Sequence, residues 1–211
     1  MAQSAELKYW EAQNLKGIGR QLSFILRFFF RLPLDIFKEQ TVLEVGTGPV
    51  GFLSLIKARK KYGIEPLKEA FENIFPLPED VEWISNKGEE IPLKDNSVDT
   101  VLCFNVIPAH VEDVDKCLSE IRRVLVKKGT LVFGMKDDVK DQFHKHIYSR
   151  AQMKLKMQEY FDVVKEVDKY RMYGMFCKPT LEAVAYGTDA NGTFPVAGDV
   201  TESIDTTEAK T

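Results

Sequence analysis

The sequence predicts an α/β fold with a doubly wound, mostly parallel sheet of seven strands that ends in an antiparallel hairpin. Short apolar runs alternate with helical patterns five times along the chain, and this alternation is typical of parallel sheets. A glycine-rich turn follows the first run, and a loop containing Gly174 joins the last two. Ligands of such sheets bind at the carboxyl ends of the strands, near the switch point after the first strand.

Each predicted strand is a short run rich in β-branched or aromatic residues and bounded by turn residues or by a helical pattern. The turn Asp95-Asn96-Ser97, for example, precedes the fourth run, TVLCF. The predicted strands are Thr41–Val45, Lys61–Ile64, Val81–Ser85, Thr100–Phe104, Thr130–Met135, Phe161–Val167 and Leu181–Tyr186.

Helical patterns fill the first 40 residues and most gaps between the strands. Pro49 suits the first turn of a helix, and Lys127, Lys128 and Gly129 suit the end of one, since bases stabilise the negative helix end and glycine follows it. Beyond the N-terminal 40 residues, helices are predicted over Pro49–Arg59, Pro66–Asn73, Asp113–Val126 and Val139–Gln158.

A narrow polar stripe runs along the predicted N-terminal helix, with spacings of four, three, four and four residues. The rest of this helix is apolar, so it is expected to pack on a core or on another subunit. A wall of an apolar substrate site and a contact with a membrane surface are the other interpretations. The stripe consists of Lys16, Arg20, Ser23, Arg27 and Arg31.

Charge and composition divide the chain into three parts. The formal net charge is −3, which excludes a generally basic nucleic-acid coat. Residues 188–211 carry five acids and one base and have few apolar side chains, so they are predicted to form an acidic flexible tail. Residues 1–40 are expected to be a helical cap, and residues 41–187 the ligand-binding domain.

Several classes of protein are excluded by absent patterns. The three cysteines form no CxxC pair, so reduced thiols and a cytoplasmic location are expected. Residues 22–37 are too short and too charged to span a bilayer. His144 and His146 point to opposite sides of a helix and lack further ligands at metal-binding spacing, so no metal site is predicted. No Walker loop, GxSxG elbow or HExxH motif is present.

Residues 44–51 (EVGTGPVG) form the most informative motif. Their glycines allow a tight turn and a close approach by a ligand, and Glu65, 19 residues after Gly46, can accept both hydroxyls of a ribose. The loop matches the dinucleotide pattern GxGxxG. Glu44 would repel a pyrophosphate but would attract an amino group, so it favours S-adenosylmethionine, which carries an ammonium and no phosphate.

At these residues the sequence resembles the class I S-adenosylmethionine-dependent methyltransferases, and within them the type 11 methyltransferase domain family. The resemblance covers residues 41–135 and includes, besides the loop, three further motifs in the family's order. These are residues 88–99 (GEEIPLKDNSVD), residues 105–111 (NVIPAHV) and residues 120–132 (EIRRVLVKKGTLV).

The resemblance implies a role for each matching position. Gly46 and Gly48 would lie under the methionine portion of the cofactor and Glu44 near its amino group, Glu65 would hold the ribose, and Asn105 would lie beside the methyl group. The cofactor-binding residues implied in this way are Glu44, Gly46, Thr47, Gly48, Glu65, Pro66, Gly88, Glu89 and Asn105.

The adenine would lie between Ile64 and Pro66, with its edge read by the backbone at Gly88. Two positions depart from the family pattern. Val50 replaces the third glycine of the loop, a change that a first helical turn is expected to tolerate. Lys87 stands where the family often has an aspartate for the adenine amine, and a lysine has no acceptor, so weaker cofactor binding is expected.

Methyl transfer needs the acceptor to be positioned near the donor, and a hydroxyl acceptor benefits from a general base. His110 is the candidate base, because the matching family position faces the substrate; a loop histidine without a role is the alternative. Tyr9 and Trp10 lie where N-terminal segments of the family often close over the cofactor, although Trp10 can equally be a core residue.

The sequence therefore predicts a methyltransferase that transfers a methyl group from S-adenosylmethionine to a small-molecule or lipid-like acceptor. The acceptor is expected to meet the N-terminal helix, the loop after the fourth strand and an Arg171–Cys177 loop. No nucleic-acid partner and no stable membrane insertion are expected. An NAD(P)-dependent oxidoreductase and a non-catalytic S-adenosylmethionine-binding protein are the alternatives.

Overall fold

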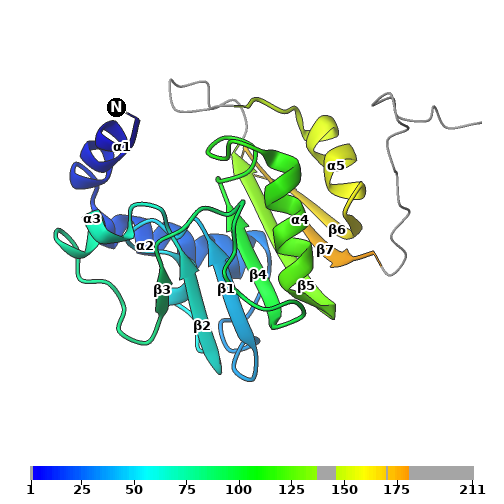
Figure 1. Ribbon diagram of the computed structural model, residues 1–211, viewed down its shortest axis with the longest axis horizontal. Helices are drawn as coiled ribbons and strands as arrows, with labels where there is room; N and C mark the ends of the chain where they lie inside the picture. Colours follow the sequence, from blue (N-terminus) through cyan, green and yellow to red (C-terminus); the bar gives the residue numbers. More distant parts are fainter. Residues whose placement is uncertain (1, 137–145, 170, 181–211) are drawn as a thin grey trace, which may run out of the picture. The chain divides into compact units, whose positions relative to one another are not determined.

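A seven-stranded sheet forms the centre of the computed structural model, which describes residues 2–136, 146–169 and 171–180, with side chains from Leu7 onward (Figure 1). The strand order is β3-β2-β1-β4-β5-β7-β6. The strands are β1 (Thr41–Val45), β2 (Lys60–Ile64), β3 (Glu82–Ile84), β4 (Val98–Phe104), β5 (Leu125–Lys136), β6 (Phe161–Lys169) and β7 (Met172–Pro179).

The pairing confirms the predicted fold class. Strands β1 to β5 pair in parallel, and β7 lies antiparallel between β5 and β6. The order reverses between β1 and β4, so the carboxyl ends of these two strands form the switch point at which open α/β sheets bind ligands. All five residues of β1 are buried, as expected of a strand covered on both faces.

Helices α4 (Val114–Val124) and α5 (Arg150–Gln158) cover one face of the sheet (Figure 1). Asp113 caps α4 by accepting a hydrogen bond from the backbone N–H of Lys116 at 2.9 Å. Ser149 and Gln152 form a reciprocal capping box at the start of α5. The core on this face is continuous from α4 to the hairpin, because Met153 and Met157 of α5 join it.

The opposite face is covered by the N-terminal segment, where α2 (Leu15–Phe24) continues into a π-helical turn, η1 (Ile25–Phe29) (Figure 1). Four phenylalanines dominate this second core, and their rings meet edge to face or tilted at centroid distances of 4.3–5.1 Å. They are Phe29, Phe30, Phe52 and Phe104. The predicted packing of the N-terminal helix onto a core is confirmed for Leu26, Phe29 and Phe30.

The N-terminal helix is divided. Helix α1 (Ala2–Glu11) ends before residues 12–14, and Asn14 caps α2 through a hydrogen bond from the N–H of Gly17. Residues 31–40 contain no helix and form turns over residues 34–39, so the prediction of helix over all of the first 40 residues is wrong at this end. Pro33 lies there, and a proline disfavours helical geometry in the residue before it.

The predicted helix over Pro49–Arg59 is wrong. Only a short 3₁₀ turn, η2 (Phe52–Ser54), forms in this stretch. Gly51 has φ = +44°, which no continuous right-handed helix can include. The Glu44 carboxyl group accepts hydrogen bonds from the first two N–H groups of the turn. The next predicted helix, Pro66–Asn73, is confirmed, because α3 (Lys68–Glu72) lies within it.

The terminal hairpin exists, but its second strand was predicted in the wrong place. The expected Arg171–Cys177 loop belongs almost entirely to β7, and the predicted strand Leu181–Tyr186 lies outside the described residues, as does the acidic tail. Part of the predicted helix Val139–Gln158 is also outside them, and its described start is Arg150. Gly174 suggested a loop, yet it lies in the strand and leaves room for the ring of Phe30.

Replacing Gly174 with alanine is therefore expected to destabilise the fold by about 1–3 kcal/mol, because the new Cβ would lie 2.5 Å from the ring of Phe30. Gly19→Ala is the matched control: its Cβ would make one ordinary contact, at 3.9 Å, and alanine favours helix α2. Urea unfolding measures both free energies. Equal stability of the Gly174→Ala variant and the wild type would contradict the packing described here.

Candidate active site

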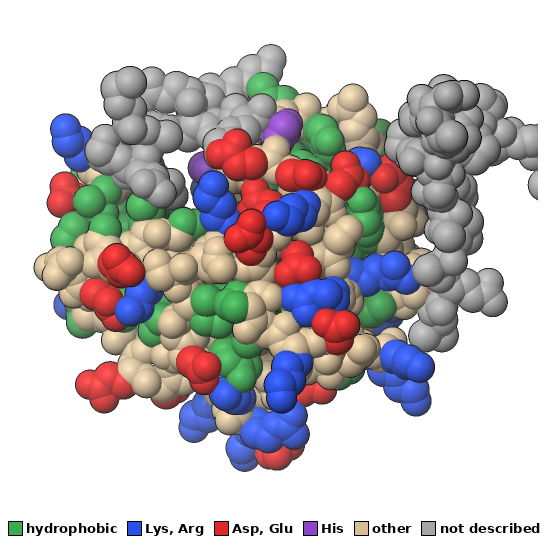
Figure 2. Space-filling model, viewed as in Figure 1, with side chains coloured by type: hydrophobic (Ala, Val, Ile, Leu, Met, Phe, Trp, Pro, Cys, Tyr) green, Lys and Arg blue, Asp and Glu red, His purple; other side chains and the backbone are tan. Residues whose placement is uncertain are grey.

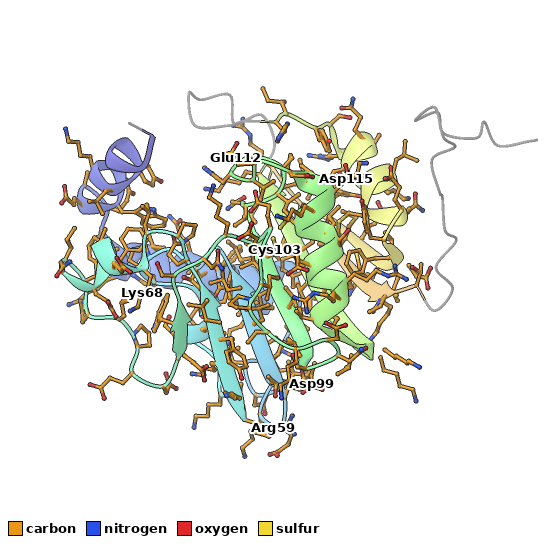
Figure 3. The ribbon with its side chains drawn as sticks, in the orientation of Figure 1. Arg59, Lys68, Asp99, Cys103, Glu112 and Asp115 are labelled. Carbon is orange, nitrogen blue, oxygen red and sulfur yellow. The ribbon has the colours of Figure 1, made fainter. Side chains whose placement is uncertain are left out.

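A cavity of about 1750 Å³ opens at the carboxyl ends of β1, β2 and β4. Figure 3 shows Glu112 at this end of the sheet and the ion pair Arg59–Asp99 at the other, with Cys103 between them in β4. The cavity brings together all ten predicted site residues. They are Glu44, Gly46, Thr47, Gly48, Glu65, Pro66, Gly88, Glu89, Asn105 and His110.

The glycine loop is held in left-handed conformations that favour glycine, with φ = +68° at Gly46 and +55° at Gly48. The N–H of Gly46 donates to the carbonyl of Ile64 at 2.8 Å, which ties the loop to the end of β2. Side chains approach both glycines closely. A Cβ on Gly46 would lie 2.3 Å from Val106, and one on Gly48 would lie 2.8 Å from the indole of Trp10.

Trp10 thus lies against the loop, as the resemblance implies for the N-terminal segment, and Tyr9 also lines the cavity. The indole makes an edge contact with Phe71 of α3 at a centroid distance of 6.2 Å. Trp10 is half-buried. It therefore combines the two roles considered for it, a packing contact and a wall of the cavity.

Glu65 is buried at the end of β2 and faces the glycine loop. Its two carboxylate oxygens accept hydrogen bonds from the N–H of Gly48 at 2.9 Å and from that of Leu67 at 3.0 Å. These two bonds to backbone N–H groups orient the Glu65 carboxylate at the end of β2. The side chain both shapes the loop and lines the cavity.

Glu44 is buried beneath the loop, with 3% of its surface exposed. It accepts hydrogen bonds from the N–H of Phe52 at 2.9 Å and of Leu53 at 3.0 Å. Burial raises the pKa of Glu44 to about 8, although these two hydrogen bonds act in the opposite direction. A cationic group entering the cavity would favour the ionised form of this side chain.

This raised pKa predicts a pH-dependent stability. The folded protein retains the Glu44 proton up to about pH 8, whereas the unfolded chain loses it near pH 4.5. The contribution of Glu44 to the free energy of unfolding is thus complete below pH 4.5. Up to a few kcal/mol of this free energy is lost as the pH rises to 8. We expect the Glu44→Gln variant to show a flatter dependence in urea titrations between pH 5 and pH 8. An unchanged slope would assign the dependence to other groups.

Thr47 places a buried hydroxyl at the cavity. Its hydroxyl is the one buried side-chain polar atom without a hydrogen-bond partner in the part of the chain that the structure describes. Thr47 lines the cavity between the two glycines of the loop. Buried polar atoms normally find partners, so a polar ligand in the cavity fits this position. The cavity also exceeds the 300–1000 Å³ or so of a typical small-ligand site, which leaves room for a cofactor and an acceptor.

The loop of residues 87–90 closes another side of the cavity. Gly88 is required there, because a Cβ would lie 2.8 Å from both Cys117 and Val45. Glu89 is buried and accepts a hydrogen bond from the N–H of Glu112 at 2.6 Å, so its carboxylate holds the loop to the segment before α4. Lys87 is exposed at the cavity.

Asn105 and His110 follow β4. Asn105 has φ = +55°, an uncommon conformation that a strand end at a ligand site can retain when its neighbours hold it. Its side-chain oxygen accepts from the N–H of Lys136 at 3.0 Å. His110 is exposed at the cavity, and its N–H donates to the carbonyl of Val106 at 2.7 Å.

Sequence reasoning missed the residues just before and within α5 that also line the cavity, among them Tyr148, Arg150 and Gln152. The predicted helix Val139–Gln158 includes them in its interior, although the Ser-x-x-Gln pattern from Ser149 is a helix-start signal that indicates their true position. His146 lies in the same segment, with its Nε2 atom 3.1 Å from the carbonyl oxygen of Glu112. No group of His, Cys, Asp or Glu in the described ranges could hold a metal ion.

Arg123 and Glu120, in the matching motif of residues 120–132, join helix α4 to the segment before β4. Its guanidinium donates to the carbonyls of Ile91 at 2.7 Å and Leu93 at 2.9 Å, and pairs with Glu120. Glu120 in turn accepts from the N–H of Ile91 at 2.8 Å. These bonds hold α4 to the segment that precedes β4, and so help to position the loop of Gly88.

Comparisons with known proteins show which family and which solved structures this chain is similar to. The profile of the methyltransferase domain family, type 11, matches residues 43–133. No curated protein sequence matches the chain at a significant level. Among solved structures, the Haloferax volcanii complex of the Trm112 methyltransferase activator with a methyltransferase gives a TM-score of 0.63 at 15% identity, covering 82% of this chain and 97% of that one.

Two further structures have the same fold. The PH0226 protein of Pyrococcus horikoshii gives a TM-score of 0.60 at 17% identity and covers 80% of this chain and 92% of its own. A SAM-dependent methyltransferase from Aquifex aeolicus gives 0.57 at 22% identity, with 80% and 100% covered. The matched segment 43–133 contains the glycine loop, Glu65 and Asn105. Residues 43–133 of this chain therefore match a methyltransferase domain of type 11, and the sheet around them has the fold of these solved methyltransferase structures.

Proposed function

We propose that the protein binds S-adenosylmethionine along the glycine loop and transfers its methyl group to a small-molecule or lipid-like acceptor in the same cavity. The observation that carries this proposal is the gathering of all ten predicted site residues around one cavity. When bound, the cofactor supplies a methyl group already activated by a sulfonium.

The residues of this chain would bind and orient the reactants. Gly46 and Gly48 would let the methionine portion approach the backbone, and Glu65 would accept the ribose hydroxyls. Asn105, tied to β5 through the N–H of Lys136, would hold the end of β4 beside the methyl group. This positioning at near-attack distance is the main requirement of an in-line displacement.

The geometry disfavours the dinucleotide alternative. A pyrophosphate normally binds the free N–H groups at the start of a helix after the glycine loop. Here a short 3₁₀ turn follows the loop, and the N–H groups of Phe52 and Leu53 already donate to Glu44. The buried Glu44 carboxyl thus occupies the donors that a phosphate would use.

The proposed class of acceptor is based on the side chains that line the cavity. The apolar lining of this cavity includes Ile18 and Leu22 of helix α2 and Ile25 of turn η1. Met135 and Tyr148 line it as well. Such walls suit an acceptor with an apolar part. No helix of the described residues is both long and apolar enough to cross a membrane. The three cysteines are free and buried, which supports the proposed cytoplasmic location.

Methyl transfer from tritiated S-adenosylmethionine into fractionated cell extract tests the acceptor class. We expect the label in small-molecule or lipid fractions; label in protein or nucleic acid would contradict the proposal. The extract also supplies protein partners, as the Haloferax structure is a complex with an activator. Cofactor binding without transfer to any fraction would favour the non-catalytic alternative.

The same assay tests His110 as the general base. If it takes a proton from the acceptor, His110→Ala is expected to lower the turnover number by about 100-fold, because general bases contribute effects of this size. His146→Ala is the matched control, since His146 also lines the cavity. An unchanged turnover number in His110→Ala would remove this residue from the mechanism.

A further inference from the structure

Helix α2 and turn η1 present an exposed aromatic pair. Phe24 and Phe28 are 45% and 62% exposed, and their rings stack on each other at a centroid distance of 5.1 Å. Large aromatic side chains cost free energy when they face water. Two of them side by side form a surface feature that a partner can cover.

Arginines surround this pair. Arg20 lies four residues before Phe24 and Arg27 three residues after it, so both are neighbours of the aromatic pair on the helical surface. Arg31 follows just beyond turn η1, where the helix has ended. All three arginines are exposed. We call these five residues the N-terminal patch.

The patch belongs to a basic stretch in a chain without a basic excess. Residues 15–34 carry four basic side chains and no acidic one, whereas the whole chain has a formal net charge of −3. On the sheet face that carries α4, acidic and basic side chains are interspersed (Figure 2). The acid-free stretch of residues 15–34 thus has a charge pattern different from that of this face.

The patch lies beside the residues of the N-terminal segment that line the cavity. Ile18, Gln21, Leu22 and Ile25 line the cavity, and none of the five patch residues does. Phe24 lies about 60° around the helix from Gln21 and about 100° from Ile25, at about 100° per residue. The patch thus lies on the face next to the apolar wall of the proposed acceptor site.

We propose that the N-terminal patch docks the enzyme on an anionic phospholipid surface. The arginines would pair with lipid headgroups and the two phenylalanines would enter the headgroup boundary, as in other interfacial helices. The exposed aromatic pair within an acid-free basic stretch favours this partner over a second copy of the chain, whose own patch would carry the same charge. Docking would place the acceptor side of α2 close to the lipid; this last step rests on the proposed function, whereas docking itself does not.

Sedimentation of the full chain with vesicles tests the proposal. We expect binding to phosphatidylcholine vesicles with about 30 mol% phosphatidylglycerol, release at about 0.5 M salt, and no binding to pure phosphatidylcholine. The R20Q/R27Q/R31Q variant should bind about 100-fold more weakly, or about fivefold for each arginine. The F24S/F28S variant should bind these vesicles about tenfold more weakly than the wild type.

The K57Q/K127Q/K128Q variant is the matched control, because it removes three exposed charges outside the segment and should bind like the wild type. Equal binding to neutral and anionic vesicles, or equal binding by the arginine variant, would overturn the proposal. The proposal would also be overturned if light scattering showed that the wild type is a dimer and the F24S/F28S variant a monomer, since the patch would then be a subunit interface. Calorimetry with S-adenosylhomocysteine, expected to be unchanged in all variants, shows separately whether the proposed function holds.

Discussion

Replacing Glu65 with alanine is expected to weaken binding of S-adenosylhomocysteine at least about tenfold, because the ribose hydroxyls lose a charged acceptor. The effect has a second source in the structure. Glu65 also orders the glycine loop through the N–H of Gly48 and the N–H of Leu67, at 2.9 and 3.0 Å. Isothermal calorimetry on the folded variant gives the affinity.

Two further variants separate these contributions. Glu69→Ala, an exposed glutamate on the adjacent helix α3, is the matched control and should bind like the wild type. Glu65→Gln keeps one acceptor oxygen without the charge, so its affinity should fall between those of the wild type and Glu65→Ala. Wild-type affinity in Glu65→Ala would show that another residue holds the ribose.

Gly46→Ala is the second change with a large expected effect. The new Cβ would lie 2.3 Å from Val106 Cγ2, and the residue would keep an unfavourable φ of +68°. We expect a loss of about 1–3 kcal/mol in the free energy of unfolding. Because the loop must move away from Val106, we also expect binding of S-adenosylhomocysteine to fall by about 100-fold or more.

The double variant Gly46→Ala/Val106→Ala identifies the cause. It removes the colliding methyl group, so part of the stability should return, while a backbone cost of about 1 kcal/mol remains. Thermal unfolding and calorimetry on the same samples measure both effects. Normal binding by Gly46→Ala would mean that the ligand does not approach the backbone at this glycine.

Much of the fold could be predicted because its signals are local. The run Thr41–Val45 is strand β1 with the predicted bounds, since five apolar or β-compatible residues before a glycine leave few alternatives. The resemblance to the methyltransferase family supplied the site residues. The strand order explains why Glu44, Glu65 and Asn105 meet, since each lies at the carboxyl end of a parallel strand.

The errors came from tertiary contacts that no local pattern records. Gly51 and the Glu44 carboxylate together stop the helix expected after the loop. Gly174 suggested a turn but makes room for Phe30, a residue more than 140 positions earlier in the chain. The cavity wall before α5 was missed for the same reason, since the sequence does not show which surface the first residues of a helix approach.

The most direct test of the central claim is calorimetry of the full chain with S-adenosylhomocysteine and, in parallel, with NADH. The buried Glu44 beneath the loop and the Glu65 carboxylate at the end of β2 predict micromolar binding of S-adenosylhomocysteine and no measurable binding of NADH. Micromolar binding of NADH, with no response to S-adenosylhomocysteine, would contradict the account.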